Sequence, residues 1–212
     1  MGNKYIQQLI GQGEHDRLDF KYEVTDAKKL ARTFSAFANT GGGKLLIGVK
    51  DNGVISGIRT DEEAYMLESA AHVFCKPAVG YSIKSWSIEG KQILEVSIEE
   101  SDSKPHLAPW KEDLWRAFIR LRDENFVANS IQLQVWKNLN SAKSTIVKYS
   151  RQEKELLTYL TKNKSITLGA FRRLSKISYS RAKKILVNLC TIGVIKIHYT
   201  DKNSAEYQLS DN

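Results

Sequence analysis

The sequence is poor in features of secreted and membrane proteins. Among 212 residues it has only two cysteines, Cys75 and Cys190. Both fall in apolar helical patterns, which predicts buried thiols rather than a disulfide or a metal site. No apolar run approaches the ~18 residues of a membrane helix, and the N-terminus lacks the apolar core of a secretory signal. We therefore expect a cytoplasmic protein without a membrane partner.

Several catalytic and cofactor motifs are also missing. The four histidines show no metal-ligand spacing, and no serine or cysteine lies in a nucleophile elbow. There is no GxxxxGK[ST] loop, and Gly41–Gly43 is expected to end a helix and enter a strand, the reverse of the order in a phosphate loop. ATP is therefore not expected as a cofactor, and nucleic-acid binding is expected to need none.

Positive charge is present in excess, and it is concentrated in the last third of the chain. Residues 1–139 hold 18 Lys and Arg against 19 Asp and Glu, whereas residues 140–212 hold 14 against 5. A neutral domain joined to a small, strongly basic one favours a polyanionic partner, most often nucleic acid. The alternative interpretation is a solvated, lysine-rich surface.

Hydrophobic periodicity predicts an α+β domain over residues 1–139. Strict alternation over residues 17–24 predicts a half-buried strand with Asp19 and Lys21 on its polar face. Because strands and helices do not alternate strictly, a mixed sheet is expected. The segment 104–109 is expected to be a loop. The predicted strands are 17–24, 45–49, 54–58, 81–88, 92–98 and 115–121, and the predicted helices are 25–38, 61–74 and 131–139.

A second domain is expected at 151–212, after a polar linker at 140–150. Its predicted helices at 151–160, 168–174 and 179–192, followed by strands at 194–199 and 205–209, have the order of a winged helix-turn-helix. The third helix of such a module usually enters the DNA major groove, although the module can serve only for dimerisation or docking. The candidate nucleic-acid contacts are Arg172, Arg173, Lys176, Tyr179, Ser180, Arg181, Lys183 and Lys184.

A set of motifs begins at Gly13 and continues through the first domain. Residues 14–21 fit E-x4-[ED]-F-K, residues 36–42 read AFANTGG, and residues 47–57 fit IGV-x-D-x-G-x-I-x-G. The tripeptides KPH at 104–106 and FIR at 118–120 follow. On these motifs, residues 10–137 resemble the Schlafen AlbA-like (divergent AAA) family. The resemblance implies a DNA-binding domain of mixed-sheet fold that is typically joined to a C-terminal winged helix.

The resemblance also implies candidate catalytic residues. Eukaryotic Schlafen proteins include metal-dependent RNA endonucleases, whose carboxylates correspond by motif to Glu14, Asp19 and Asp51. Such carboxylates suit Mg²⁺ or Mn²⁺, and Lys21 is placed to contact a phosphate. Two structural interpretations stay open. Asp51 suits a hairpin turn, and Glu14 reaches Asp19 only if the chain bends between residues 13 and 17.

We interpret the chain as a nucleic-acid-binding protein, specifically a bacterial DNA-binding transcriptional regulator that acts as a homodimer. Arg120 is expected to add a contact to the nucleic acid from the first domain. The four tryptophans, Trp110 among them, are expected in the core or an interface rather than as base-stacking platforms. The alternative function is a Mg²⁺- or Mn²⁺-dependent endoribonuclease that uses Glu14, Asp19 and Asp51 on RNA.

Overall fold

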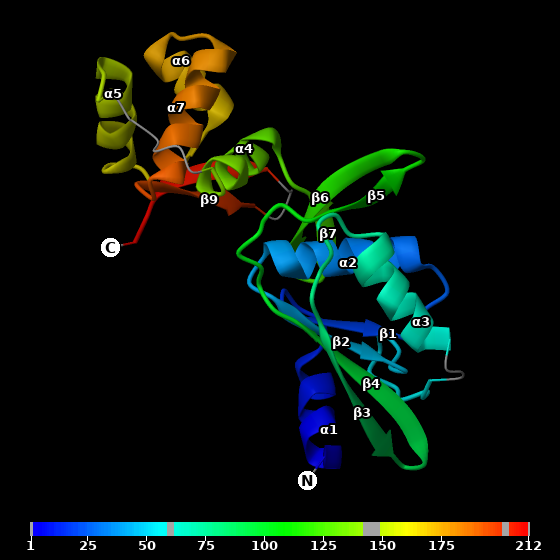
Figure 1. The fold of residues 1–212 in the computed structure, drawn as a ribbon. Helices are drawn as coiled ribbons and strands as arrows, with labels where there is room; N and C mark the ends of the chain where they lie inside the picture. Colours follow the sequence, from blue (N-terminus) through cyan, green and yellow to red (C-terminus); the bar gives the residue numbers. More distant parts are fainter. Residues whose placement is uncertain (1, 59–61, 142–148, 201–203, 212) are drawn as a thin grey trace. The chain divides into compact units, whose positions relative to one another are not determined.

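A computed structural model describes residues 2–58, 62–141, 149–200 and 204–211 (Figure 1). The chain divides into two compact units, Met1–Ala128 and Asn129–Asn212. This division differs from the boundary expected at residue 139. Helix α4 (Ser130–Leu139) belongs to the C-terminal unit, because Ile131 and Val135 are buried in its core. Of the expected linker at 140–150, residues 142–148 lie outside the described residues.

The N-terminal unit contains a four-stranded mixed sheet with the strand order β1-β2-β4-β3. Strand β1 runs parallel to β2, and the other pairs are antiparallel. Strand β2 is covered on both faces, as its continuous apolar run predicts, since Leu45, Leu46 and Ile47 are fully buried. The strands are β1 (Leu18–Lys21), β2 (Gly43–Ile47), β3 (Ser82–Ile88) and β4 (Lys91–Ile98).

A second, antiparallel sheet lies on the other side of helix α2 (Ala27–Asn39), so that α2 is sandwiched between the two sheets (Figure 1). Periodicity predicted one apolar face for this helix, but it is buried on nearly all sides. The loop expected at 104–109 gives way to a strand at Leu107, and neither the first nor the last strand of this sheet was predicted. The strands are β5 (Leu107–Lys111), β6 (Leu114–Leu121) and β7 (Glu124–Val127).

Asn39 joins the end of α2 to the second sheet. Its side-chain amide donates to the carbonyl oxygens of His106 and Phe118, each at 2.9 Å, and its Oδ1 accepts from the His106 N–H at 2.9 Å. The side chain is 4% exposed, so these groups have no access to water. Within the motif AFANT, Asn39 therefore lies at the end of α2 and also hydrogen-bonds this helix to the second sheet.

Helix α1 (Gly2–Gln12), which was not predicted, covers the opposite face of the four-stranded sheet. Its Tyr5 hydroxyl donates to Glu95 at 2.6 Å, Trp86 donates to the same carboxylate at 2.8 Å, and Lys44 pairs with it. Burial alone would raise the pKa of Glu95, but these donors hold the pKa below its usual value. The polar network anchors α1 beside the apolar contact of Ile6 with the sheet.

Two predicted elements of this unit differ in detail. The hairpin at Asn52-Gly53 is present, but its return segment makes a single bridge, Val49 to Ile55, instead of a strand. The helix expected at 61–74 appears as α3 (Glu62–Glu68) followed by a π-helical turn, Ser69–Val73; residue 61 lies outside the described residues. In the described residues, no helix is long and apolar enough to span a bilayer.

The C-terminal unit follows the predicted order, with α4 and one short strand added. Its sheet is antiparallel with the order β8-β10-β9. Leu156, Phe171, Leu186 and Tyr207 form the centre of its core. The tip between β9 and β10, residues 201–203, lies outside the described residues. The elements are α5 (Arg151–Leu160), β8 (Ile166–Thr167), α6 (Leu168–Ser175), α7 (Tyr179–Thr191), β9 (Ile195–Tyr199) and β10 (Ala205–Leu209).

Both cysteines are free thiols, as predicted. Cys75 lies in the core of the N-terminal unit, and Cys190 packs at the edge of the C-terminal core. Burial raises the pKa of each thiol to about 12. Because the thiolate is the reactive form, neither cysteine is suited to nucleophilic or redox chemistry.

The contacts of Asn39 lead to a stability prediction. Asn39→Ala is expected to lower the free energy of unfolding by about 2–4 kcal/mol, because it leaves the Phe118 carbonyl and the His106 N–H buried without partners, while the His106 carbonyl keeps the Ser35 hydroxyl as donor. Urea unfolding followed by tryptophan fluorescence measures this change. Asn3→Ala, at an exposed position, is the control and should shift stability by less than about 0.5 kcal/mol. Equal effects of the two variants would contradict the assignment.

Candidate functional site

A tight turn brings Glu14 beside the start of β1. Gly13 has a φ of 69°, and His15 and Leu18 exchange backbone hydrogen bonds of 2.9 and 3.3 Å. Glu14 Oε1 then accepts the Phe20 N–H at 2.8 Å. The bend that the sequence required between residues 13 and 17 is therefore present, and Glu14 reaches the neighbourhood of Asp19.

Asp19 is the centre of this site and is only 3% exposed. Its Oδ1 accepts from Arg120 Nη2 at 3.0 Å. Its Oδ2 lies 2.9 Å from Lys21 Nζ, an ion-pair distance, although it accepts no hydrogen bond of good geometry. On the predicted polar face of β1, Asp19 is thus buried while Lys21 stays partly exposed, and two cations neutralise the aspartate.

Arg120 has a structural position rather than the predicted contact position. Its side chain is 2% exposed, it donates to Asn125 Oδ1 at 3.1 Å, and its guanidinium lies 5.4 Å from the ring centre of Phe37. Arg116, four residues earlier and on the same face in the strand pattern, is exposed. The alternation of a strand shows which residues share a face, but not which part of that face other elements bury. The sequence therefore assigned Arg120 wrongly to the nucleic-acid surface.

Glu14 and Asp19 interact with each other. The pKa of Glu14 lies above its usual value, mainly because burial raises it. The hydrogen bond with Asp19 and the negative charge of Asp19 raise the pKa further, while the hydrogen bond from the Phe20 N–H and the charge of Lys21 lower it. The environment of Glu14 therefore favours its protonated form more than water does.

The predicted three-carboxylate metal site is not assembled. Asp51 is exposed in the hairpin turn, and the described residues contain no group of three His, Cys, Asp or Glu side chains placed to hold a metal ion. Glu14 and Asp19 come together, but both oxygens of Asp19 already face cations. These residues do not fit Mg²⁺ or Mn²⁺, which need free carboxylate oxygens. Asp51 instead lies in the hairpin turn, as the structural interpretation of its position before Asn52-Gly53 predicted.

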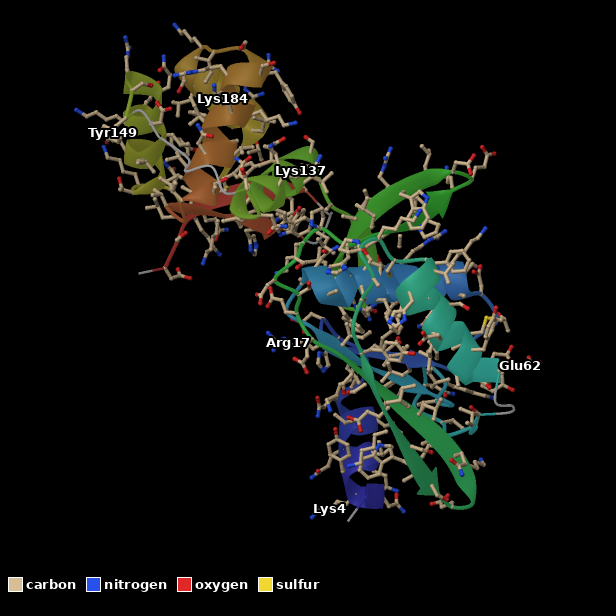
Figure 2. All side chains as sticks on the ribbon, in the orientation of Figure 1. Lys4, Arg17, Glu62, Lys137, Tyr149 and Lys184 are labelled. Carbon is tan, nitrogen blue, oxygen red and sulfur yellow. The ribbon has the colours of Figure 1, made fainter. Side chains whose placement is uncertain are left out.

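The predicted contact residues of the second unit lie together on α6, α7 and the turn between them. We call this set the α6–α7 surface: Arg172, Arg173, Lys176, Tyr179, Ser180, Arg181, Lys183 and Lys184. All are exposed except Lys183, which is half-buried. Lys184 lies on α7 (Figure 2). Among the described residues of this unit, an ion pair joins Lys196 to Asp211, and none involves the α6–α7 surface.

The turn before α7 is built locally. The Ser178 hydroxyl accepts the Arg181 N–H at 3.3 Å and caps the helix. Lys176 ends α6 in the left-handed conformation, with a φ of 50°, and its N–H bonds to the Arg172 carbonyl. The side chains at the start of α7 are therefore held on a defined, short turn.

The fold and these two sites define a two-unit α+β protein with a buried carboxylate site in one unit and a basic helical surface in the other. The model of the family Schlafen, AlbA_2 matches residues 14–129. This match spans more than half of the chain, and the chain belongs to that family. The matched region ends one residue after the first compact unit, at residue 129.

Two solved structures are similar to parts of the chain. One is the DIP2311 protein from Corynebacterium diphtheriae, with 16% identity and a TM-score of 0.48, covering 70% of this chain and 35% of that one. The other is the N-terminal domain of a protein from Nitrosomonas europaea described as related to the DNA helicase RecG, with 21% identity and a TM-score of 0.43, covering 71% and 96%. No curated protein matches.

The buried ion pair gives a second prediction. Arg120→Met is expected to cost about 3–5 kcal/mol of stability, because it removes the buried guanidinium from Asp19 Oδ1 and leaves Lys21 as the remaining ion-pair partner of the carboxylate among the described residues. Arg116→Met removes an exposed arginine from the same strand and should cost less than about 0.5 kcal/mol. Urea unfolding of both variants tests this difference. Unchanged stability of Arg120→Met would show that the guanidinium is not a structural cation.

Proposed function

We propose that the protein binds duplex DNA through the α6–α7 surface and acts as a transcriptional regulator. The observation that carries this proposal is the cluster of exposed cations on two successive helices, with no carboxylate paired to it among the described residues. The order of α5, α6, α7, β9 and β10 fits a winged helix-turn-helix. In such modules the helix corresponding to α7 enters the major groove.

The surface offers side chains of two kinds. Tyr179, Ser180 and Arg181 begin α7, where side chains of a docked recognition helix meet base edges. Arg172 and Lys176 precede that helix and suit the phosphates that flank the groove. A homodimer would present two such helices to half-sites about one helical turn apart, and we include this assembly in the proposal.

The endoribonuclease alternative has weaker support. The carboxylates that it requires do not gather at one place, since Asp51 stands apart from Glu14 and Asp19. Incubation with tRNA and Mn²⁺ separates the two functions. Cleavage by the wild type that Glu14→Ala with Asp19→Ala abolishes would favour the nuclease and overturn the regulator proposal.

Removal of two cations from α7 tests the DNA-binding surface. Arg181→Ala with Lys184→Ala is expected to weaken binding of a 30-base-pair duplex pool at least tenfold and to reduce the salt slope of the affinity by about 1–2, as two phosphate contacts would. Gel-shift titrations at two salt concentrations measure both quantities.

The matched control is Lys162→Ala with Lys164→Ala, which removes the same charge from exposed positions of the same unit. It should change the affinity by less than about threefold, since only long-range attraction is lost. If the two double variants weaken binding equally, net charge alone attracts the DNA and the α6–α7 surface is not its site.

Lys176 allows stability and binding to be separated. Lys176→Gly is expected to stabilise the C-terminal unit by about 0.5–1 kcal/mol, because glycine tolerates the positive φ that strains a lysine. The same change should weaken duplex binding a few-fold, because one phosphate contact is lost. Thermal unfolding and gel-shift titration measure the two effects. A loss of stability, or unchanged DNA affinity, would contradict one of the two roles assigned to Lys176.

A further inference from the structure

Strand β3 forms one edge of the four-stranded sheet, since it comes last in the order β1-β2-β4-β3 (Figure 1). Its seven residues, SIKSWSI, include no proline, and their register with β4 runs from Ser82 to Ile88 without a shift. Residues 82–85 are all exposed, and the side chain of Ile83 is 43% exposed. A long, regular and exposed edge of this kind is a template for another strand.

The pairing inside the sheet determines which backbone groups of β3 face outward. Lys44 donates its N–H to the Arg17 carbonyl at 2.8 Å, on the β1 side of β2. Its neighbour Leu45 therefore faces β4 and pairs there with Val96, which turns away from β3. Because Val96 lies opposite Ile83, every second residue of β3 starting at Ile83 presents both its N–H and its carbonyl to the open edge. These outward residues are Ile83, Ser85 and Ser87.

The opposite edge of the same sheet, strand β1, is closed by the chain itself. The N–H and carbonyl of Leu18 exchange hydrogen bonds with His15, at 3.3 and 2.9 Å. The Phe20 N–H donates to the Glu14 carboxylate at 2.8 Å, and the Phe20 carbonyl accepts from Lys21 Nζ at 2.6 Å. Both outward residues of β1 therefore have their backbone groups occupied, and another strand could pair there only by displacing these contacts.

The first strand of the second sheet, β5, is closed in a similar way. Leu107 exchanges backbone hydrogen bonds with Lys76, at 2.7 and 2.9 Å. Arg32 donates to the carbonyl oxygens of Pro109 at 2.8 Å and Trp110 at 2.9 Å. The side chain of Trp110, expected in the core or an interface, is 38% exposed here. Strand β5 also contains a proline and a register shift, two features that prevent a further strand from pairing.

The outward groups of β3 have no comparable cover. Among the described parts of the chain, no backbone hydrogen bond outside the β3–β4 ladder reaches Ile83, Ser85 or Ser87. A charged side chain can also protect an edge, but Lys84 Nζ lies 4.1 Å from the ring centre of Trp86 on the same strand. The lysine therefore lies along β3 rather than projecting beyond it. Two edges of this unit are closed, and the β3 edge is open.

We propose that β3 pairs with β3 of a second copy of the chain, antiparallel and with the two-fold axis at Ser85. Ser85 then lies opposite Ser85 of the partner subunit, and Ile83 lies opposite Ser87 of the partner subunit. Each of these pairs exchanges two backbone hydrogen bonds, because all the residues in them face outward. The two four-stranded sheets thereby become one continuous sheet.

The side chains favour this register over its neighbours. With the axis at Ser85, Lys84 lies opposite Trp86 of the partner subunit and can make there the cation–π contact that it makes in its own strand. An axis at Lys84 would place two ammonium groups directly opposite each other, which is unfavourable. An axis at Trp86 would shorten the ladder, because Ile83 would then face Glu89, which lies beyond the end of the strand.

This inference names the interface of the homodimer that the proposed function includes, and it rests on that assembly. It does not depend on the DNA contacts of the α6–α7 surface, which belongs to the other unit. Since only a few residues of each subunit meet at a strand edge, the interface is small, and dissociation at micromolar concentrations is expected.

Sedimentation velocity of the full chain without DNA, over a micromolar concentration series, tests the interface. The wild type is expected to pass from monomer to dimer as its concentration rises. Ser85→Pro should raise the Kd of the dimer at least tenfold, because it removes the N–H of each subunit at the axis. The fold should tolerate this change, since proline is accepted in an edge strand where its nitrogen faces outward.

A pair of opposite charges at Ser85 tests the position of the axis. Ser85→Lys and Ser85→Glu should each raise the Kd about three- to tenfold, because each places like charges opposite each other across the axis. An equimolar mixture of the two variants should associate at least as tightly as the wild type, since opposite charges then meet. Ser103→Lys, which adds the same charge at an exposed loop position, is the control and should leave the Kd unchanged.

Three results would overturn the interface: a wild type that stays monomeric throughout the series, a dimer that Ser85→Pro leaves intact, or a charge mixture that associates no better than either variant alone. A monomeric wild type would also remove the homodimer from the proposed function. A dimer that the Ser85 variants leave intact would remove only the β3 interface. Duplex binding is measured separately by gel shift, and its loss in the α7 variants concerns the α6–α7 surface alone.

Discussion

A single buried ion pair, between Asp19 and Arg120, joins the two sheets of the N-terminal unit. Asp19 belongs to the four-stranded sheet and Arg120 to the three-stranded one, with α2 between them. The guanidinium also contacts the Phe37 ring of that helix. Burial of two charges is unfavourable unless both are paired and hydrogen-bonded. The pair therefore specifies one arrangement of helix and sheets, in which Asn125 and Asn39 complete the polar contacts.

This constraint changes the meaning of the family motif in this chain. The resemblance implied that the segment E-x4-[ED]-F-K supplies carboxylates to a metal, but here the arginine of the FIR tripeptide pairs with one oxygen of Asp19 and Lys21 faces the other. Each carboxylate oxygen of Asp19 therefore already has a cation beside it.

The sequence predicted the positions of most helices and strands better than it predicted which of their side chains are buried. The alternating and continuous apolar runs located β2, the β3–β4 hairpin and the helices of the C-terminal unit within one or two residues. It missed α1, although Tyr5, Ile6, Leu9 and Ile10 recur at helical spacing. It also missed β5, which was expected to be part of a loop, and the short strands β7 and β8. It also extended β1 as far as residue 24, although the ladder ends at Lys21.

Site prediction failed where tertiary contacts decide the outcome. Motif spacing correctly suggested that Glu14 and Asp19 meet, since only a local bend was needed. It could not show that Arg120 turns inward or that Asp51 stays in its turn, because both depend on how separate elements pack. The exposure of Trp110 depends on the edge position of β5 and has no signal in the sequence. The cationic character of the last third needed no packing information, and the residues of the α6–α7 surface are exposed except Lys183, which is half-buried.

The joint between the units lies at one peptide bond. The Ala128 N–H bonds to the Ala117 carbonyl at 2.9 Å and completes the second sheet, while the next residue, Asn129, caps α4 with its side chain. Helix α4 in turn supplies Ile131 to the C-terminal core. A recombination event that exchanged the C-terminal unit would have to carry α4 with it, because a break after residue 139 would remove part of that core. The boundary between the two units therefore lies between residues 128 and 129.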